Sequence, residues 1–166
     1  VYPRFVSHMS NISYDDLPDS IINALVCTED KRFFKHNGVD YVGIARATVN
    51  NLKSRSFKEG GSTITQQLIK NTHLSNDKTV KRKLKEIKLA HQLEKKLSKK
   101  EILVAYLNTV YFGNNCFGIN KAAKYYFDKD VAALDLSESA MLVGLLKAPN
   151  KYDPYVNYDK AINRKD

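Results

Sequence analysis

Three helix-start signals constrain the fold of this chain more than any other feature of its sequence. A Ser, Thr or Asp precedes a Glu or Gln by three residues at Thr63-x-x-Gln66, Ser98-x-x-Glu101 and Asp135-x-x-Glu138. In this pattern, the capping box, the two side chains satisfy backbone N–H groups at the start of a helix. Strand signals are scarce by comparison, so the sequence predicts a mostly α fold.

Other helices are predicted from caps and from the spacing of apolar residues. Pro18 lies near the start of a helix that reaches about residue 26, and Asp40 can cap another that reaches about residue 52. The longest candidate spans 79–97. Val80 and Leu84 belong to one of its apolar faces, and Leu89 and Leu93 to the opposite one, which predicts burial on both sides at the centre of the fold.

Composition fits one globular domain over residues 1–166. Hydrophobic residues make up 43% of the chain and charged residues 27%, and no linker-like segment divides it. The longest apolar run, residues 140–146, is too short to span a bilayer. We expect any membrane anchor to lie outside this chain.

Positive charge is concentrated in one segment. The net charge is +9, and residues 70–100 contain eleven Lys or Arg against three acids. Such a segment indicates an anionic partner, which could be a nucleic acid, a phosphate-bearing substrate or an anionic membrane surface. The alternative is an ordinary solvated helix face.

Two acids, Glu29 and Asp30, end a helix that is otherwise apolar. A helix C-terminus disfavours negative charge and, with partial burial, raises the pKa of a carboxyl group, so either acid is a candidate general base. The alternative is surface pairing with Lys31, Arg32 or His36. We expect His36 to hold the following loop rather than to react.

The segment from Gly60 to Lys70 is a candidate anion-binding site. Two glycines before a helix N-terminus allow an anion to approach free N–H groups closely, and hydroxyl, amide and ammonium groups follow. The alternative is an N-cap with ordinary polar neighbours. On the next predicted helix, Glu86 stands among lysines and Arg82, where it could steer a cation or orient the lysines, and a buried cluster of this kind needs an anion to balance it. The alternative is an Arg82–Glu86 pair at i,i+4 spacing, which contributes only about 0.3–0.5 kcal/mol if exposed.

Together these motifs resemble those of the peptidoglycan glycosyltransferases, glycosyltransferase family 51. The similar segments are Glu29–Gly38, Gly60–Gln67, Arg82–Glu86 and Ser98–Asn108, and the resemblance extends over about residues 14–155. Family members occur as the transglycosylase domain of class A penicillin-binding proteins and as monofunctional transglycosylases. The resemblance implies a lysozyme-like, mostly α domain with a large lobe and a small membrane-facing jaw.

The resemblance also implies roles for individual residues. Glu29 aligns with the catalytic base, which deprotonates the 4-hydroxyl of the acceptor sugar, and Glu86 with a second essential acid near the donor pyrophosphate. Lys78 stands where some members have arginine, which keeps the charge but loses bidentate geometry. The positions that align with substrate-binding groups are Ser62, Gln66, Gln67, Lys70, Lys78, Arg82 and Lys85.

The expected partners follow from the same resemblance. They are lipid II and the growing glycan strand, moenomycin-type inhibitors, and the anionic surface of a bacterial plasma membrane on its extracytoplasmic face. Residues 31–58 fit the membrane-facing jaw, with contacts expected through Phe33, Phe34 or Phe57. We expect no nucleic acid and no organic cofactor. A divalent cation, Mg²⁺ or Mn²⁺, stays open because no metal-ligand cluster is visible.

Two other functions remain alternatives. A basic helical module that binds nucleic acid explains the charge but gives no reason for Glu29 and Glu86. A lysozyme-like hydrolase would use a carboxylate pair to cleave glycan rather than extend it.

Overall fold

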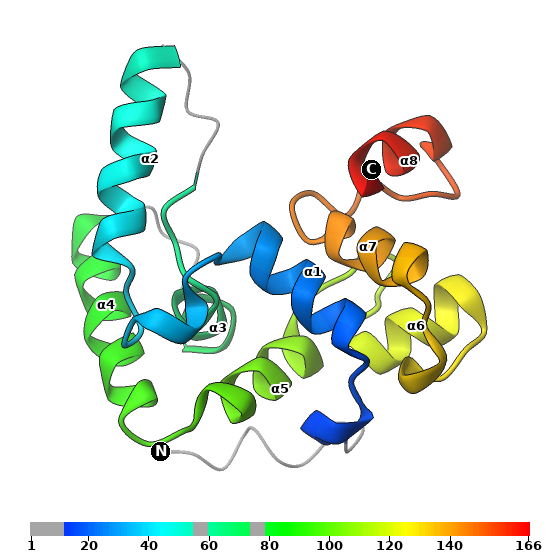
Figure 1. The fold of residues 1–166 in the computed structure, drawn as a ribbon, viewed down its shortest axis with the longest axis horizontal. Coiled ribbons are helices and arrows are strands. Elements are labelled where there is room, and N and C mark those ends of the chain that lie inside the picture. Colours follow the sequence, from blue (N-terminus) through cyan, green and yellow to red (C-terminus); the bar gives the residue numbers. More distant parts are fainter. Residues whose placement is uncertain (1–11, 55–59, 74–78) are drawn as a thin grey trace. The chain divides into compact units, whose positions relative to one another are not determined.

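The computed structural model describes residues 12–54, 60–73 and 79–166 (Figure 1). Within these ranges the chain forms eight α-helices and three short 3₁₀ helices and no β-strand, which confirms the predicted mostly α fold. An isolated bridge joins Tyr111 and Phe117. None of the helices in the described ranges has the length and apolar character needed to cross a membrane.

The chain divides into two compact units. Unit 1 contains Val1–Thr28 and Leu103–Asp166, and unit 2 contains Glu29–Ile102. Unit 2 holds 18 of the 27 Lys and Arg residues but only 8 of the 18 acids, so its formal net charge is +10 and that of unit 1 is −1. The positive charge predicted to mark an anionic partner therefore belongs to unit 2.

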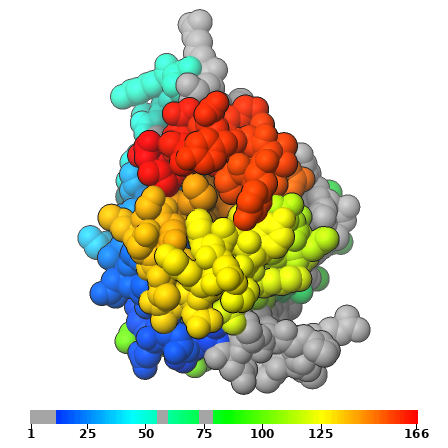
Figure 2. Space-filling view, turned by 90° about the vertical axis from the view of Figure 1, so that its right-hand side faces the viewer, coloured from blue at the N-terminus to red at the C-terminus, as the bar shows by residue number. Residues whose placement is uncertain are grey.

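Unit 1 is built around buried apolar residues of five helices. They are α1 (Asp19–Glu29, whose last residue belongs to unit 2), α5 (Lys99–Thr109, which begins in unit 2), α6 (Ile119–Phe127), α7 (Leu136–Leu145) and α8 (Tyr158–Lys165). Ile21, Tyr106, Ile119 and Leu142 are fully buried, and α7 packs against both α6 and α8. Figure 2 shows the surface of α6 and α8 on this unit.

A turn between α5 and α6 has unusual backbone conformations at its glycines and asparagines. Gly118 has φ of 89°, and a Cβ there would lie 2.7 Å from the carbonyl oxygen of Asn108. Asn114, also at positive φ, donates to Asp153 at 3.0 Å and to the Tyr126 hydroxyl at 3.1 Å. Burial raises the pKa of Tyr126 to about 12. This polar network fixes the turn against α6.

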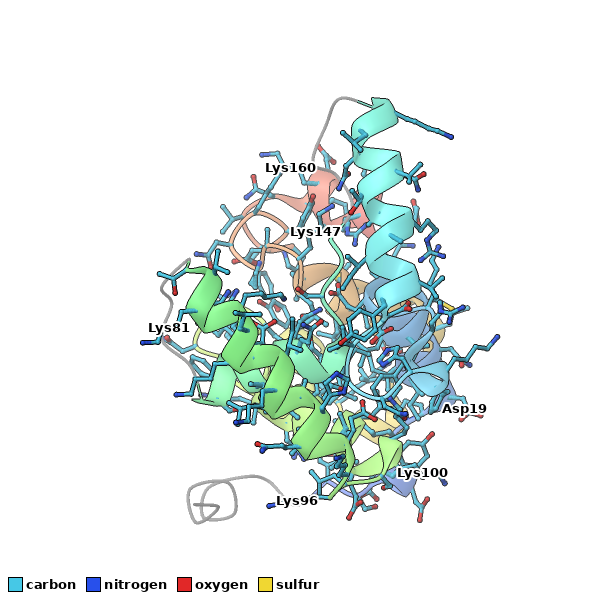
Figure 3. The ribbon with its side chains drawn as sticks, turned by 90° about the vertical axis from the view of Figure 1, so that its left-hand side faces the viewer. Asp19, Lys81, Lys96, Lys100, Lys147 and Lys160 are labelled. Atoms are coloured by element: carbon cyan, nitrogen blue, oxygen red, sulfur yellow. The ribbon has the colours of Figure 1, made fainter. Side chains whose placement is uncertain are left out.

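Unit 2 contains α2 (Tyr41–Ser54), α3 (Ile64–His73) and α4 (Val80–Glu94). Helix α3 packs against α4, and Ile64, Leu68, Ala90 and Leu93 are buried. In Figure 3 many charged side chains surround α4, and the labelled Lys81 projects away from it.

All three predicted capping boxes form. Thr63 Oγ1 accepts from the Gln66 N–H while Gln66 Oε1 accepts from the Thr63 N–H, both at 3.1 Å. Ser98 and Glu101 make the same exchange at the start of α5, and Asp135 and Glu138 at the start of α7. The three predictions are therefore confirmed. Each box was predictable because its contacts lie within four consecutive residues.

The predicted burial of the longest helix on both sides is wrong. Val80 and Leu84 are exposed, and the buried residues of α4 are Glu86, Ala90 and Leu93. These three are spaced four and three apart, so they form one stripe on the helix. Helix α4 is therefore buried along one side only, and that side includes a carboxylate.

Candidate active site

Glu29 is the last residue of α1 and is half-buried. Its carboxylate oxygen Oε2 accepts a hydrogen bond from Nε2 of Gln67 on α3, at 2.9 Å. The helix C-terminus beside it carries partial negative charge from unpaired carbonyl groups. The amide therefore orients a carboxylate that the helix itself does not stabilise.

Asp30 has a different environment although it is the next residue. Its side chain is buried, Oδ2 accepts from the backbone N–H of Ile64 at 3.1 Å, and both carboxylate oxygens lie 3.0 Å from His36 Nε2. The carboxylate thus joins the start of α3 to the segment after α1. Asp30 is engaged in the fold, and His36 holds this loop as expected.

The two adjacent glutamines also separate. Gln66 is fully buried, and its Oε1 is engaged in the capping box with Thr63. Gln67, one residue later, points its amide to Glu29.

Thr63 in turn donates to the carbonyl oxygen of Gly38 at 2.6 Å. Gly38 has φ of 92°, and a Cβ there would lie 2.9 Å from the Ala90 backbone, so only glycine fits.

Glu86 lies on the buried stripe of α4, with 2% of its side chain exposed. Arg82 Nη1 donates to one of its oxygens at 2.7 Å, and Lys83 Nζ to the other at 2.5 Å. The same Lys83 nitrogen donates to Ser62 Oγ at 2.9 Å. Ser62, Arg82, Lys83 and Glu86 therefore form one cluster, which brings together two segments 20 residues apart.

The remaining predicted site residues lie outside these contacts. Lys70 on α3 and Lys85 on α4 are exposed, and neither forms an ion pair with a described residue. Lys78 lies outside the described residues. The described structure thus brings together Glu29 with Gln67, and Ser62 with Arg82 and Glu86.

Lys83 is the cluster member that the sequence analysis did not single out. A local signal existed, because Lys83 and Glu86 stand at i,i+3 spacing on a helix. The contact with Ser62 gave no such signal, since it depends on how α4 packs beside the start of α3.

A second buried ion pair lies at the other end of α4. Glu94 Oε1 accepts from Thr65 at 2.6 Å and from Lys99 at 2.7 Å, and the Lys99 nitrogen lies 4.4 Å from the centre of the Phe33 ring. Phe33 is fully buried. The expectation that Phe33 contacts a membrane is therefore wrong, because the 3₁₀ helix Phe33–Lys35 places this ring inside unit 2.

Exposed apolar side chains are nevertheless present in the segment expected to face a membrane. Phe34 is exposed, and so are Val42, Val49 and Leu52 on α2. Arg46 and Lys53 are exposed on the same helix. Phe57 lies outside the described residues.

No metal site is formed by the described part of unit 2 or unit 1. Within residues 12–54, 60–73 and 79–166, no three His, Cys, Asp or Glu side chains lie close enough together to hold an ion.

Comparison with known proteins finds one protein family and several similar proteins. A protein-family model described as Transglycosylase matches residues 4–166. Penicillin-binding protein 1A of Neisseria lactamica is 50% identical over 146 residues, which cover 88% of this chain and 18% of that protein. Penicillin-binding protein 1A of Aquifex aeolicus is 44% identical over 155 residues, covering 93% of this chain and 21% of that protein.

A more distant relative extends the comparison. Penicillin-binding protein 4 of Bacillus subtilis is 39% identical over 155 residues, which cover 93% of this chain and 25% of that protein. The chain therefore spans between about a fifth and a quarter of the length of these curated relatives.

Proposed function

We propose that this chain, which belongs to the transglycosylase family, is a peptidoglycan glycosyltransferase. In this proposal it polymerises lipid II into glycan strands for the bacterial cell wall. The observation that carries the proposal is the half-buried Glu29 at the end of α1, oriented by the Gln67 amide. A basic cluster centred on Glu86 lies in the same unit. The first group suits proton abstraction and the second suits a phosphate-bearing donor.

Glu29 acts as the general base in this proposal. The 4-hydroxyl of the acceptor sugar loses its proton to the carboxylate as its oxygen attacks the anomeric carbon of the lipid-linked donor. The bond from that carbon to the pyrophosphate oxygen breaks, undecaprenyl pyrophosphate leaves, and the configuration inverts to β. Gln67 occupies Oε2 of Glu29, which leaves Oε1 to receive the proton.

Positive charge stabilises the leaving group. Negative charge grows on the pyrophosphate as its bond to the sugar breaks, and oriented cations beside it lower the barrier. Arg82, with Lys70, Lys78 and Lys85, supplies this charge in the proposal. Glu86 is buried against two cations, and its role is to fix their positions rather than to exchange a proton.

The apolar side chains of α2 provide a surface for the membrane in which the substrate's lipid remains. Val42, Val49 and Leu52 are exposed beside Arg46 and Lys53, a combination that suits an anionic lipid interface on the extracytoplasmic face. Moenomycin-type phosphoglycolipids, which carry a phosphate and a lipid, are expected to compete with the donor.

The experiment that tests this function is incubation of the purified protein with labelled lipid II, followed by sizing of the products. Polymers are expected. Short fragments released from preformed glycan would instead identify a hydrolase. Salt-sensitive binding to random duplex DNA without lipid II turnover would identify a nucleic-acid-binding module. Repeating the reaction with EDTA, then with Mg²⁺ or Mn²⁺ added back, decides whether a divalent cation takes part.

A further inference from the structure

Lys83 joins the two segments that form the cluster around Glu86. Its ammonium group bridges Ser62 Oγ, at 2.9 Å, and Glu86 Oε1, at 2.5 Å. Ser62 precedes the capping box of α3, and Glu86 lies on the buried stripe of α4. One nitrogen therefore connects the candidate anion-binding segment to Glu86 on the buried stripe of α4.

The direction of the hydrogen bond between Lys83 and Ser62 is fixed by chemistry. An ammonium group has three donors and no acceptor, so Ser62 Oγ is the acceptor. The Ser62 hydroxyl proton must then point elsewhere, and no described residue accepts it. Donation from a cation also polarises the hydroxyl group, which makes it a stronger donor to the next acceptor.

The charge of the cluster favours an anionic acceptor. Glu86 contributes one negative charge, and Arg82 and Lys83 contribute two positive charges. The cluster therefore keeps one net positive charge after its internal pairing. An oriented hydroxyl donor beside an excess positive charge complements a phosphate oxygen.

We propose that Lys83 is a positioning residue that orients and polarises the Ser62 hydroxyl as a donor to the pyrophosphate leaving group of the lipid-linked substrate. Lys83 acts through Ser62 and does not itself contact the substrate. This inference rests on the proposed function. It adds that Lys83 orients Ser62, one of the residues expected to bind the lipid-linked substrate.

The test is a double-mutant cycle with lipid II as substrate. We compare kcat and KM for the wild type, Lys83→Met, Ser62→Ala and the double variant. Lys83→Met is expected to lower kcat/KM by about tenfold or more, mostly through kcat, because the negative charge on the leaving oxygen grows in the transition state. In the Ser62→Ala background, the factor by which Lys83→Met lowers kcat/KM should be at least about threefold smaller.

The matched control is Lys88→Met, an exposed lysine on the same helix. It removes the same charge without touching the cluster, so its kcat/KM should stay within about twofold of the wild type. Circular dichroism and thermal unfolding show whether each variant is folded.

A second variant keeps the inference testable if Lys83→Met does not fold. Lys83→Arg retains a positive charge beside Glu86, but its longer planar group donates from other positions than the ammonium, so the geometry at Ser62 changes. Its loss of kcat/KM should likewise shrink in the Ser62→Ala background. Equal losses in both backgrounds, or no loss at all, overturn the inference alone. A wild type that makes no polymer overturns the proposed function and this inference with it.

Discussion

At the residue scale, neighbouring side chains of the same chemical type have separate tasks. Glu29 is half-buried against an amide, whereas Asp30 is buried against a backbone N–H group and a histidine. The sequence could identify the pair, because two acids at a helix C-terminus are unfavourable there. It could not separate them, because the contact that joins Asp30 to the start of α3 comes from Ile64, 34 residues later.

Asp30→Ala should destabilise the protein by roughly 1–3 kcal/mol. The substitution leaves the buried N–H of Ile64 and the buried His36 ring without their acceptor, and a buried unsatisfied group costs about this much. Urea unfolding followed by circular dichroism measures the change. Asp130→Ala, which removes an exposed carboxylate at a negative φ with no side-chain cap hydrogen bond, is the control and should change the free energy of unfolding by less than about 1 kcal/mol. Equal effects of the two substitutions would show that Asp30 is not a structural acceptor.

At the element scale, local signals proved reliable and long-range ones did not. The three capping boxes were predictable because each is complete within four residues. The buried side of α4 was not predictable, since it depends on packing against α3, and a stripe containing Glu86 looks polar in the sequence. The burial of Phe33 was not predictable either, because it depends on contacts beyond its own segment.

Tyr126 should make the stability of the fold sensitive to alkaline pH. Its pKa is raised to about 12 by burial, whereas the unfolded value is about 10. Below pH 10 both states hold the proton and the stabilisation is complete. Between about pH 10 and 12 the unfolded state loses its proton first, so stability falls as pH rises.

Comparison with Tyr126→Phe isolates this effect. The substitution removes the hydroxyl that donates to the Phe112 carbonyl, so the variant should be less stable than the wild type at pH 8. The difference in free energy of unfolding should shrink between pH 10 and 12. A difference that stays constant across this range would show that Tyr126 titrates normally.

Helix α2 should contribute to membrane binding through its exposed apolar side chains. Val42→Ser with Leu52→Ser should reduce co-sedimentation with vesicles containing anionic lipid several-fold, because apolar area that enters the interface is lost. The control is Leu136→Ser with Val156→Ser in unit 1. Leu52 and Leu136 are 73% and 72% exposed, and Val42 and Val156 are 56% and 73% exposed. Equal sedimentation of the two folded variants would place the membrane contact elsewhere.

At the scale of the whole molecule, the main feature is the distribution of positive charge. The sequence showed that positive charge is concentrated in residues 70–100, and unit 2, which contains that segment, carries a formal net charge of +10. The sequence did not show how the cations are used. Arg82 and Lys83 pair with Glu86, while Lys70 and Lys85 remain exposed. Which cation pairs with a buried acid depends on tertiary packing, so charge density was predictable and charge pairing was not.

The proposal that Glu29 is the general base of a polymerising glycosyltransferase is tested by the substitution Glu29→Gln. An amide cannot take the acceptor's proton, so the variant should fold like the wild type and form no glycan polymer from labelled lipid II. Asp128→Asn, an acid-to-amide change at an exposed site, should polymerise normally. Polymer formation by a folded Glu29→Gln protein at the wild-type rate would show that Glu29 is not the general base.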